Sequence, residues 1–171
     1  NGSILGDGAY KDVQGNGLVI GGLGGSVTVA GGMTVNGSVA ANSNGANATA
    51  IRLGTGATVP TIKSAGNITA TGGSGATTIV RSVVVDAGAN LASITNSGRI
   101  SAAAAVDGTA IAIADNSGTL SLVTNSGTIS ATSANAGANK AIAIDLSANG
   151  SGATVRQTLV AANAAAPVIT G

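Results

Sequence analysis

One short phrase recurs along this chain, as NSGRIS at Asn96–Ser101 and as NSGTIS at Asn125–Ser130. Looser copies of the phrase end at the β-branched residues Val39 and Ile68. The β-branched residues of the four copies stand at positions 39, 68, 100 and 129, which gives intervals of 29, 32 and 29. Self-similarity at a fixed period of this length is typical of repeat architectures, in which each repeat is one structural unit.

Two further phrases keep nearly the same period. One phrase alternates apolar residues, as in Ile51 and Leu53, Val83 and Val85, Ile111 and Ile113, and Ile142 and Ile144. Another phrase pairs apolar residues three positions apart, as in Val59 and Ile62, Leu91 and Ile94, and Leu120 and Val123. Alternation with β-branched residues predicts short strands, and the Asn-Gly and Gly-Gly pairs between them predict turns.

The three phrases together predict an all-β fold, a right-handed parallel β-solenoid (β-helix) with about three strands per coil of about 30 residues. The right hand follows from the usual handedness of parallel crossover connections. In such a stack, equivalent residues of successive coils form ladders inside a narrow core. One predicted ladder contains Val39, Ile68, Ile100 and Ile129, and the other contains Ile51, Val83, Ile111 and Ile142. The substitution Ile111→Asp is therefore predicted to place an unpaired charge in the core and to unfold the array locally.

Two other interpretations remain open. The Asn-Gly pairs are also typical of antiparallel hairpins, and a chain rich in Gly, Ser, Ala and Asn is also typical of disordered or silk-like segments. Neither explains why the apolar register returns at a nearly constant period, and the mean hydropathy of +0.44 does not favour disorder.

The register divides the chain into three parts. Residues 1–17 match no phrase and are expected to be a lead-in segment, and residues 18–158 are expected to be the solenoid repeats. Residues 159–171 are expected to start a further coil or to form a linker. The expected coils lie near 18–35, 36–63, 64–95, 96–124 and 125–158.

Composition excludes several classes of function. The 171 residues contain no His and no Cys, which excludes an imidazole base, a thiol nucleophile and Cys- or His-based metal centres. A net charge of +1 and a single aromatic residue, Tyr10, do not suit nucleic-acid binding. No apolar run approaches the roughly 20 residues of a membrane-spanning helix, so we expect this segment not to be membrane-embedded. No phosphate-binding loop or catalytic grouping is evident, and we expect neither a cofactor nor enzymatic activity.

Two sets of polar residues also follow the repeat. Asp86, Asp115 and Asp145 recur at intervals of 29 and 30, which is compatible with solvated turn residues or with a weak candidate ladder for a cation such as Ca²⁺. Asn96 and Asn125 are one coil apart, which is compatible with a ladder of hydrogen-bonded amides or with turn residues.

The phrase NSG-x-I/L-S, at residues 96–101, 116–121 and 125–130, resembles the passenger regions of bacterial autotransporters, as do GATVP at 56–60 and AIAIDL at 141–146. This resemblance covers residues 18–171. It implies a β-solenoid that is secreted across the outer membrane of a Gram-negative bacterium and is displayed at the cell surface or released.

These observations lead to the expectation of a non-enzymatic extracellular protein with a structural or adhesive role, a section of a surface-displayed passenger stalk. The alternative is a self-assembling filament or surface-layer subunit that polymerises through uncapped solenoid ends. Weaker alternatives are a solenoid that binds glycans or ice, for instance through hydroxyls such as Ser130 and Thr132, and a polysaccharide lyase. The expected partners are other copies of the chain or molecules on host or neighbouring cells.

Overall fold

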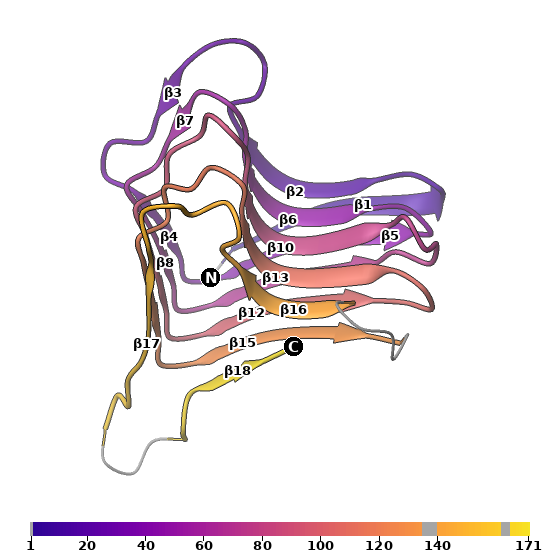
Figure 1. The fold of residues 1–171 in the computed structure, drawn as a ribbon. Helices are drawn as coiled ribbons and strands as arrows, with labels where there is room; N and C mark the ends of the chain where they lie inside the picture. Colours follow the sequence, from indigo (N-terminus) through magenta and orange to yellow (C-terminus); the bar gives the residue numbers. More distant parts are fainter. Residues whose placement is uncertain (1, 135–139, 162–164) are drawn as a thin grey trace.

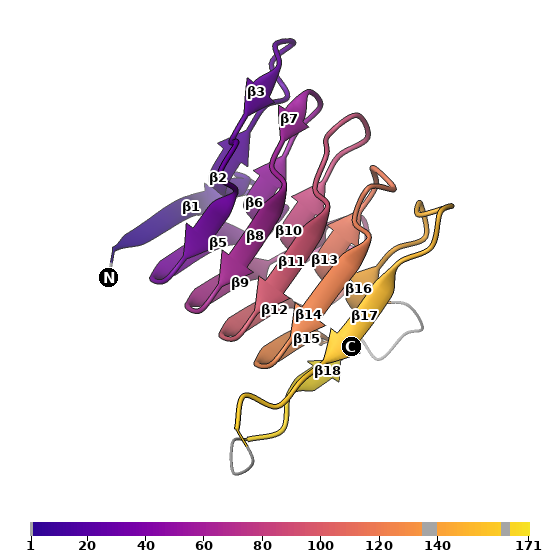
Figure 2. The same ribbon diagram turned by 90° about the vertical axis from the view of Figure 1, so that its left-hand side faces the viewer.

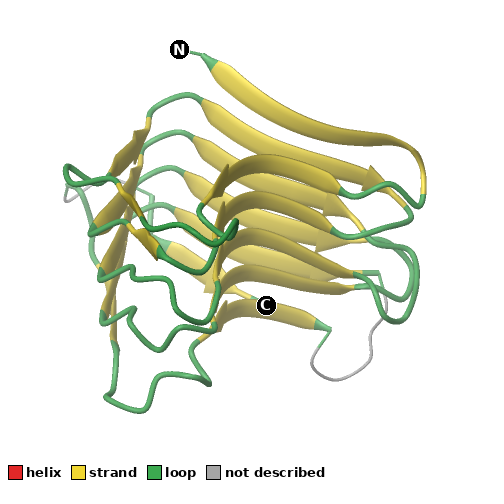
Figure 3. Ribbon diagram, turned by 90° about the horizontal axis from the view of Figure 1, so that it is seen from above, coloured by secondary structure: helices red, strands yellow, loops and turns green. Residues whose placement is uncertain are grey.

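The computed structural model describes residues 2–134, 140–161 and 165–171, and these contain strands and loops only (Figure 3). Within those residues there is accordingly no helix with the length and apolar character needed to cross a membrane. Residues 162–164, which belong to the segment predicted to start a further coil or linker, lie outside the described residues.

Three parallel sheets run along the molecule, and each coil of the chain adds one strand to each sheet (Figures 1 and 2). The first sheet consists of β1 (Ser3–Lys11), β5 (Ser38–Asn44), β9 (Asn67–Gly72), β12 (Arg99–Ala104), β15 (Thr128–Ser133) and β18 (Val168–Thr170). The second sheet consists of β2 (Gly15–Ile20), β6 (Ala48–Leu53), β10 (Ile79–Val85), β13 (Thr109–Asp115) and β16 (Ala141–Asp145). The third sheet consists of β4 (Met33–Val35), β8 (Thr61–Ser64), β11 (Ser93–Asn96), β14 (Leu122–Asn125) and β17 (Thr154–Gln157).

The order of strands in each sheet follows the order of the chain, so the architecture is a β-solenoid of five coils, and β18 adds one more strand to the first sheet. The predicted fold class is confirmed. The first two coils also carry a short fourth strand, β3 (Val27–Thr28) and β7 (Ala57–Thr58), which pair with each other.

In the first sheet, β-branched residues of successive coils stack in one column. Ile68 pairs with Val39 on one side and with Ile100 on the other, and Ile100 pairs with Ile129. All four side chains are buried in the main core. The column arises because successive residues of a strand point to opposite faces, so that residues two positions apart face the same side.

The strands of the second sheet break this alternation. In β10, the fully buried residues are Val80, Ser82, Val83 and Val85, so two consecutive residues face the core. The residue at the break is small in every coil, since the residues that lie between two paired positions are Gly17, Ala50, Ser82, Ala112 and Ala143. These strands are visibly curved in Figure 1. Small residues suit the break, because the side chains on both sides of it already fill the core.

The second predicted ladder is wrong beyond Val83. Ile51 does pair with Val83, but Val83 pairs with Ile113 and not with Ile111. Ile111 pairs instead with Arg81 and with Ile142, on the opposite side of the strand, where it packs in a separate small cluster. The column in the main core therefore runs through Ile51, Val83, Ile113 and Ile144.

The first coil begins earlier than the sequence analysis expected. Residues 1–17 were expected to be a lead-in, yet β1 pairs with β5 over most of its length and places Ile4 beside Val39. The repeat is hard to recognise there because Gly6 takes the position of the core residue Ala41. A methyl group at Gly6 would overlap the backbone of Asn16, so the close approach of β1 and β2 requires glycine.

Glycine in the recurring phrase has a similar steric cause, which yields a testable prediction. A Cβ atom at Gly127 would overlap the carbonyl oxygen of Gly98 in the preceding coil. We expect Gly127→Ala to lower the free energy of unfolding by about 1–3 kcal/mol, because the coils must shift apart. Urea unfolding followed by circular dichroism measures the change. The control is Gly150→Ala, where a Cβ atom would meet nothing within 4 Å; equal unfolding midpoints for the two variants would contradict the prediction.

Candidate functional site

The outer face of the second sheet carries two columns of residues that point away from the main core. Arg81 lies in the column that continues to Thr49 in the preceding coil and to Ile111 in the next one. Arg52 lies in the adjacent column, where its neighbour in the next coil is Val84. The two arginines therefore lie on successive coils, β6 and β10, of the same face.

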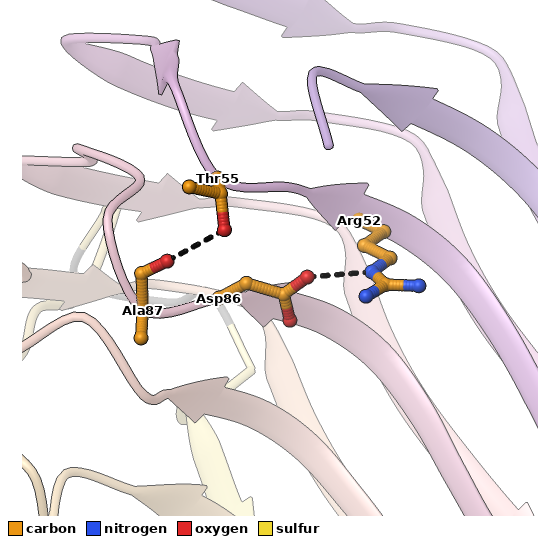
Figure 4. A network of polar contacts seen from close by, with 4 residues as sticks. All are labelled: Arg52, Thr55, Asp86 and Ala87. Carbon is orange, nitrogen blue, oxygen red and sulfur yellow. Dashed lines mark hydrogen bonds and ion pairs between the residues drawn. The ribbon is translucent and has the colours of Figure 1, made fainter. Parts of the chain in front are cut away.

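Arg52 forms an ion pair with the carboxylate that follows β10. Its Nε donates to Oδ2 of Asp86 at 2.6 Å, and this contact joins two coils (Figure 4). A second contact between the same coils lies close by, where the hydroxyl of Thr55 donates to the carbonyl oxygen of Ala87 at 2.9 Å. About half of the Arg52 side chain remains exposed, so this pair contributes little to stability and leaves the terminal nitrogens of Arg52 accessible.

Arg81 is more deeply placed than Arg52. Its Nε is buried and has no hydrogen-bond partner among the described residues. Burial lowers the pKa of Arg81 below its usual value, and the positive charge of Arg52 lowers it further. The negative charges of Asp86 and Asp145 act in the opposite direction and raise the pKa. The guanidinium nevertheless stays protonated at neutral pH, because arginine does not lose its proton in proteins. The face thus holds a half-buried cationic group whose Nε is buried without a hydrogen-bond partner among the described residues.

A polar hollow of about 240 Å³ surrounds these charges. Its lining is polar except for one valine and comes from four successive coils: Gln14, Asn16, Asn47, Thr49, Arg52, Arg81, Val84, Asp86 and Asn116. One lining amide is already engaged, since Oδ1 of Asn47 accepts a hydrogen bond from the backbone N–H of Ile79 at 2.7 Å. Two guanidinium groups beside one carboxylate do not suit a metal cation, but they suit an anionic group that also carries hydroxyls.

The three predicted aspartates do not form a ladder. Asp115 follows the core residue Val85 in its column, whereas Asp145 follows Ala114 on the outer face. Asp86 lies one position beyond the paired part of β10. Accordingly, the described ranges 2–134, 140–161 and 165–171 contain no group of three or more His, Cys, Asp or Glu residues that could hold a metal ion.

Asp115 has a local structural role. It is buried, and its Oδ1 accepts hydrogen bonds from the backbone N–H and the hydroxyl of Ser117, at 3.0 and 2.6 Å. Its Oδ2 accepts a hydrogen bond from the N–H of Leu120 at 2.9 Å. Asp115 therefore closes the turn that leads from the second sheet toward the third.

Asn96 and Asn125 lie in one column of the third sheet and are both fully buried. Nδ2 of Asn96 donates to Oδ1 of Asn125 at 2.8 Å and also to the carbonyl oxygen of Thr128 at 3.0 Å. Nδ2 of Asn125 donates to the carbonyl oxygens of Gly127 and Val168, both at 3.1 Å. The pair stabilises the corner between the third and first sheets, although Oδ1 of Asn96 is buried without a hydrogen-bond partner among the described residues.

The polar hollow was not found from the sequence, although a signal for it exists. Arg52 interrupts the alternating phrase between Ile51 and Leu53, and Arg81 follows it 29 positions later, close to one period. Two arginines at this spacing inside apolar strands indicate an outward-facing basic group on neighbouring coils. The break in alternation hides their relation, because it places them in adjacent columns and not in the same one.

No protein-family model, no curated protein and no solved structure matches this chain.

Proposed function

We propose that this chain is a non-enzymatic structural or adhesive segment, a section of a stalk displayed at the surface of a Gram-negative bacterium. The observation that carries the proposal is the stack itself: five successive coils add one strand each to the same three parallel sheets. In this arrangement each additional coil lengthens the rod by about 4.8 Å, the spacing of neighbouring strands. The distance that the stalk extends from the cell surface then depends on the number of coils.

The composition of the chain agrees with such a role. Charged residues make up only 8% of the chain, and cysteine is missing altogether, so folding needs no disulfide in any compartment. The resemblance to autotransporter passengers implies the same location. The partners of the proposed stalk are molecules on host or neighbouring cells, or other copies of the chain.

A filament or surface-layer subunit is the second candidate. The outermost strands of the described stack expose apolar side chains, with Ile4 and Leu5 on β1 and Val155 and Val168 on β17 and β18. Strands with unpaired edges can accept strands of another copy by β-augmentation.

The two candidates predict different particles. We expect the purified chain to form discrete short rods in electron microscopy, and a variant with five extra copies of residues 96–124 to form rods about 24 Å longer. Small-angle scattering checks the same increase in the longest dimension. Particles whose longest dimension does not grow with coil number would contradict the stalk, whereas long fibres would favour the filament.

The location requires its own test. In the source bacterium, an antibody against the folded solenoid should label intact cells as strongly as permeabilised cells. Labelling that appears only after permeabilisation would contradict surface display.

A further inference from the structure

The polar hollow on the second sheet has the features of a ligand site that the stalk role does not use. Arg81 contributes a buried Nε without a hydrogen-bond partner in the described part of the chain. Arg52, on the preceding coil, engages Asp86 through Nε alone in the contacts of Figure 4. Because this Nε is closed to solvent, a ligand in the hollow would meet other atoms of Arg81, which is one of the lining residues.

The charges around the hollow favour an anion. Two guanidinium groups and one carboxylate line the hollow, so the charge of its lining is positive, while Asp145 acts on Arg81 from outside the lining. Guanidinium groups bind carboxylates through parallel, charge-assisted hydrogen bonds, which are stronger and more directional than those between neutral groups. A carboxylate is therefore the chemical group that these two arginines would recognise best.

The remaining lining residues determine what else the ligand carries. Asn16, Asn116 and Thr49 offer both donors and acceptors, and Asp86 offers acceptors only. Sulfate has no donor for Asp86, and inorganic phosphate has only its P–OH groups. Hydroxyl groups can donate to Asp86 and can both donate to and accept from the amides. Val84 is the one apolar residue in the lining, so the hollow has little to offer the side chains of a peptide.

We propose that this hollow binds an acidic saccharide, with the carboxylate of a sugar acid held between Arg52 and Arg81 and its hydroxyls held by Asn16, Asn116 and Asp86. The inference does not rest on the stalk proposal, because the site is defined by its own residues and would be present in any solenoid that contains coils one to four. The lining comes from successive coils, so a saccharide chain would run along the stack and not around it. Uronates and sialates share the required chemistry.

The direct test is calorimetric titration of the whole chain with two probes, a trigalacturonate and a sialyllactose. We expect at least one of them to bind, and we expect its counterpart with the carboxylate reduced to an alcohol to bind at least tenfold more weakly. Arg81→Gln and Arg52→Gln should each weaken binding at least tenfold. Arg52 is half exposed, so Arg52→Gln should fold normally even if Arg81→Gln does not, and circular dichroism verifies this.

The control variant is Arg156→Gln. Arg156 lies on β17 of the third sheet, is exposed, and does not line the hollow, so its loss should change affinity less than twofold. The proposal is overturned if neither acidic probe binds, if the reduced saccharide binds equally well, or if Arg156→Gln weakens binding as much as Arg52→Gln. Binding of inorganic phosphate with equal affinity would also overturn it, since the hollow would then select charge and not a sugar acid.

Discussion

Replacing Ile113 with aspartate should abolish the cooperative unfolding transition of the solenoid, whereas the same replacement at Ile111 should preserve it. Ile113 is fully buried in the main core between Val83 and Ile144 of the adjacent coils. A carboxylate there has no partner and no access to water, and its cost of several kcal/mol is comparable to the whole stability of a small domain. Far-ultraviolet circular dichroism during thermal unfolding measures the outcome.

Ile111 is the matched control, because it has the same side chain in the same strand, two residues away. It lies on the opposite side of the sheet, and its neighbour in the preceding coil is Arg81, which can pair with the new carboxylate. This expectation replaces the one made from the sequence, in which Ile111 belonged to the core. If Ile111→Asp unfolds the chain as completely as Ile113→Asp, the assignment of the two faces is wrong.

Asn125→Ala should lower the free energy of unfolding by about 3 kcal/mol, because it leaves several buried groups without partners. The amide of Asn125 accepts from Nδ2 of Asn96 and donates to the carbonyl oxygens of Gly127 and Val168. All of these contacts cross from one coil to the next or close the same corner. Urea unfolding provides the measurement.

A double-mutant cycle separates the pair from its surroundings. Asn96→Ala combined with Asn125→Ala should cost less than the sum of the two single variants, since each single change already breaks the hydrogen bond between them. Asn67→Ala, at an exposed position of β9, should change stability by less than about 0.5 kcal/mol. Strict additivity at positions 96 and 125 would show that the amides do not interact.

The column of β-branched residues from β5 to β15 of the first sheet could be predicted from the sequence, whereas β1 could not. A repeated β-branched residue at the same point of the phrase marks the same column, as with Ile68, Ile100 and Ile129. The repeat also indicates which segments pair in parallel, because equivalent positions in a stack must lie one strand spacing apart.

The second sheet shows where that reasoning stops. The sequence suggested that Val83 lies above Ile111, whereas the structure pairs Val83 with Ile113, the next apolar residue of the same alternating phrase. Coil length varies from turn to turn, and a slip of two positions preserves the apolar alternation, so pattern alone cannot distinguish the two registers. The small residue at Ser82 or Ala112 reveals the true register only once the curvature of the strand is known.

The candidate site could not be predicted from the sequence for the same reason. Arg52 is 29 positions before Arg81 and 34 before Asp86, and the two arginines do not occupy one common position of the phrase. In each strand of the second sheet two consecutive residues face the core, and this changes which of the following residues point outward. Arg52 and Arg81 therefore lie in adjacent columns of neighbouring coils, and both columns line the same hollow.

The order of residues along the chain was therefore enough to establish a stack of similar three-stranded coils, since only a repeating backbone path returns the same apolar residue once per period. The folded structure was needed to assign each residue of the second sheet to one face of its strand, and with it to locate the charged hollow. That assignment depends on the bend within the strand, which is a property of how the coils pack and not of the order of polar and apolar residues.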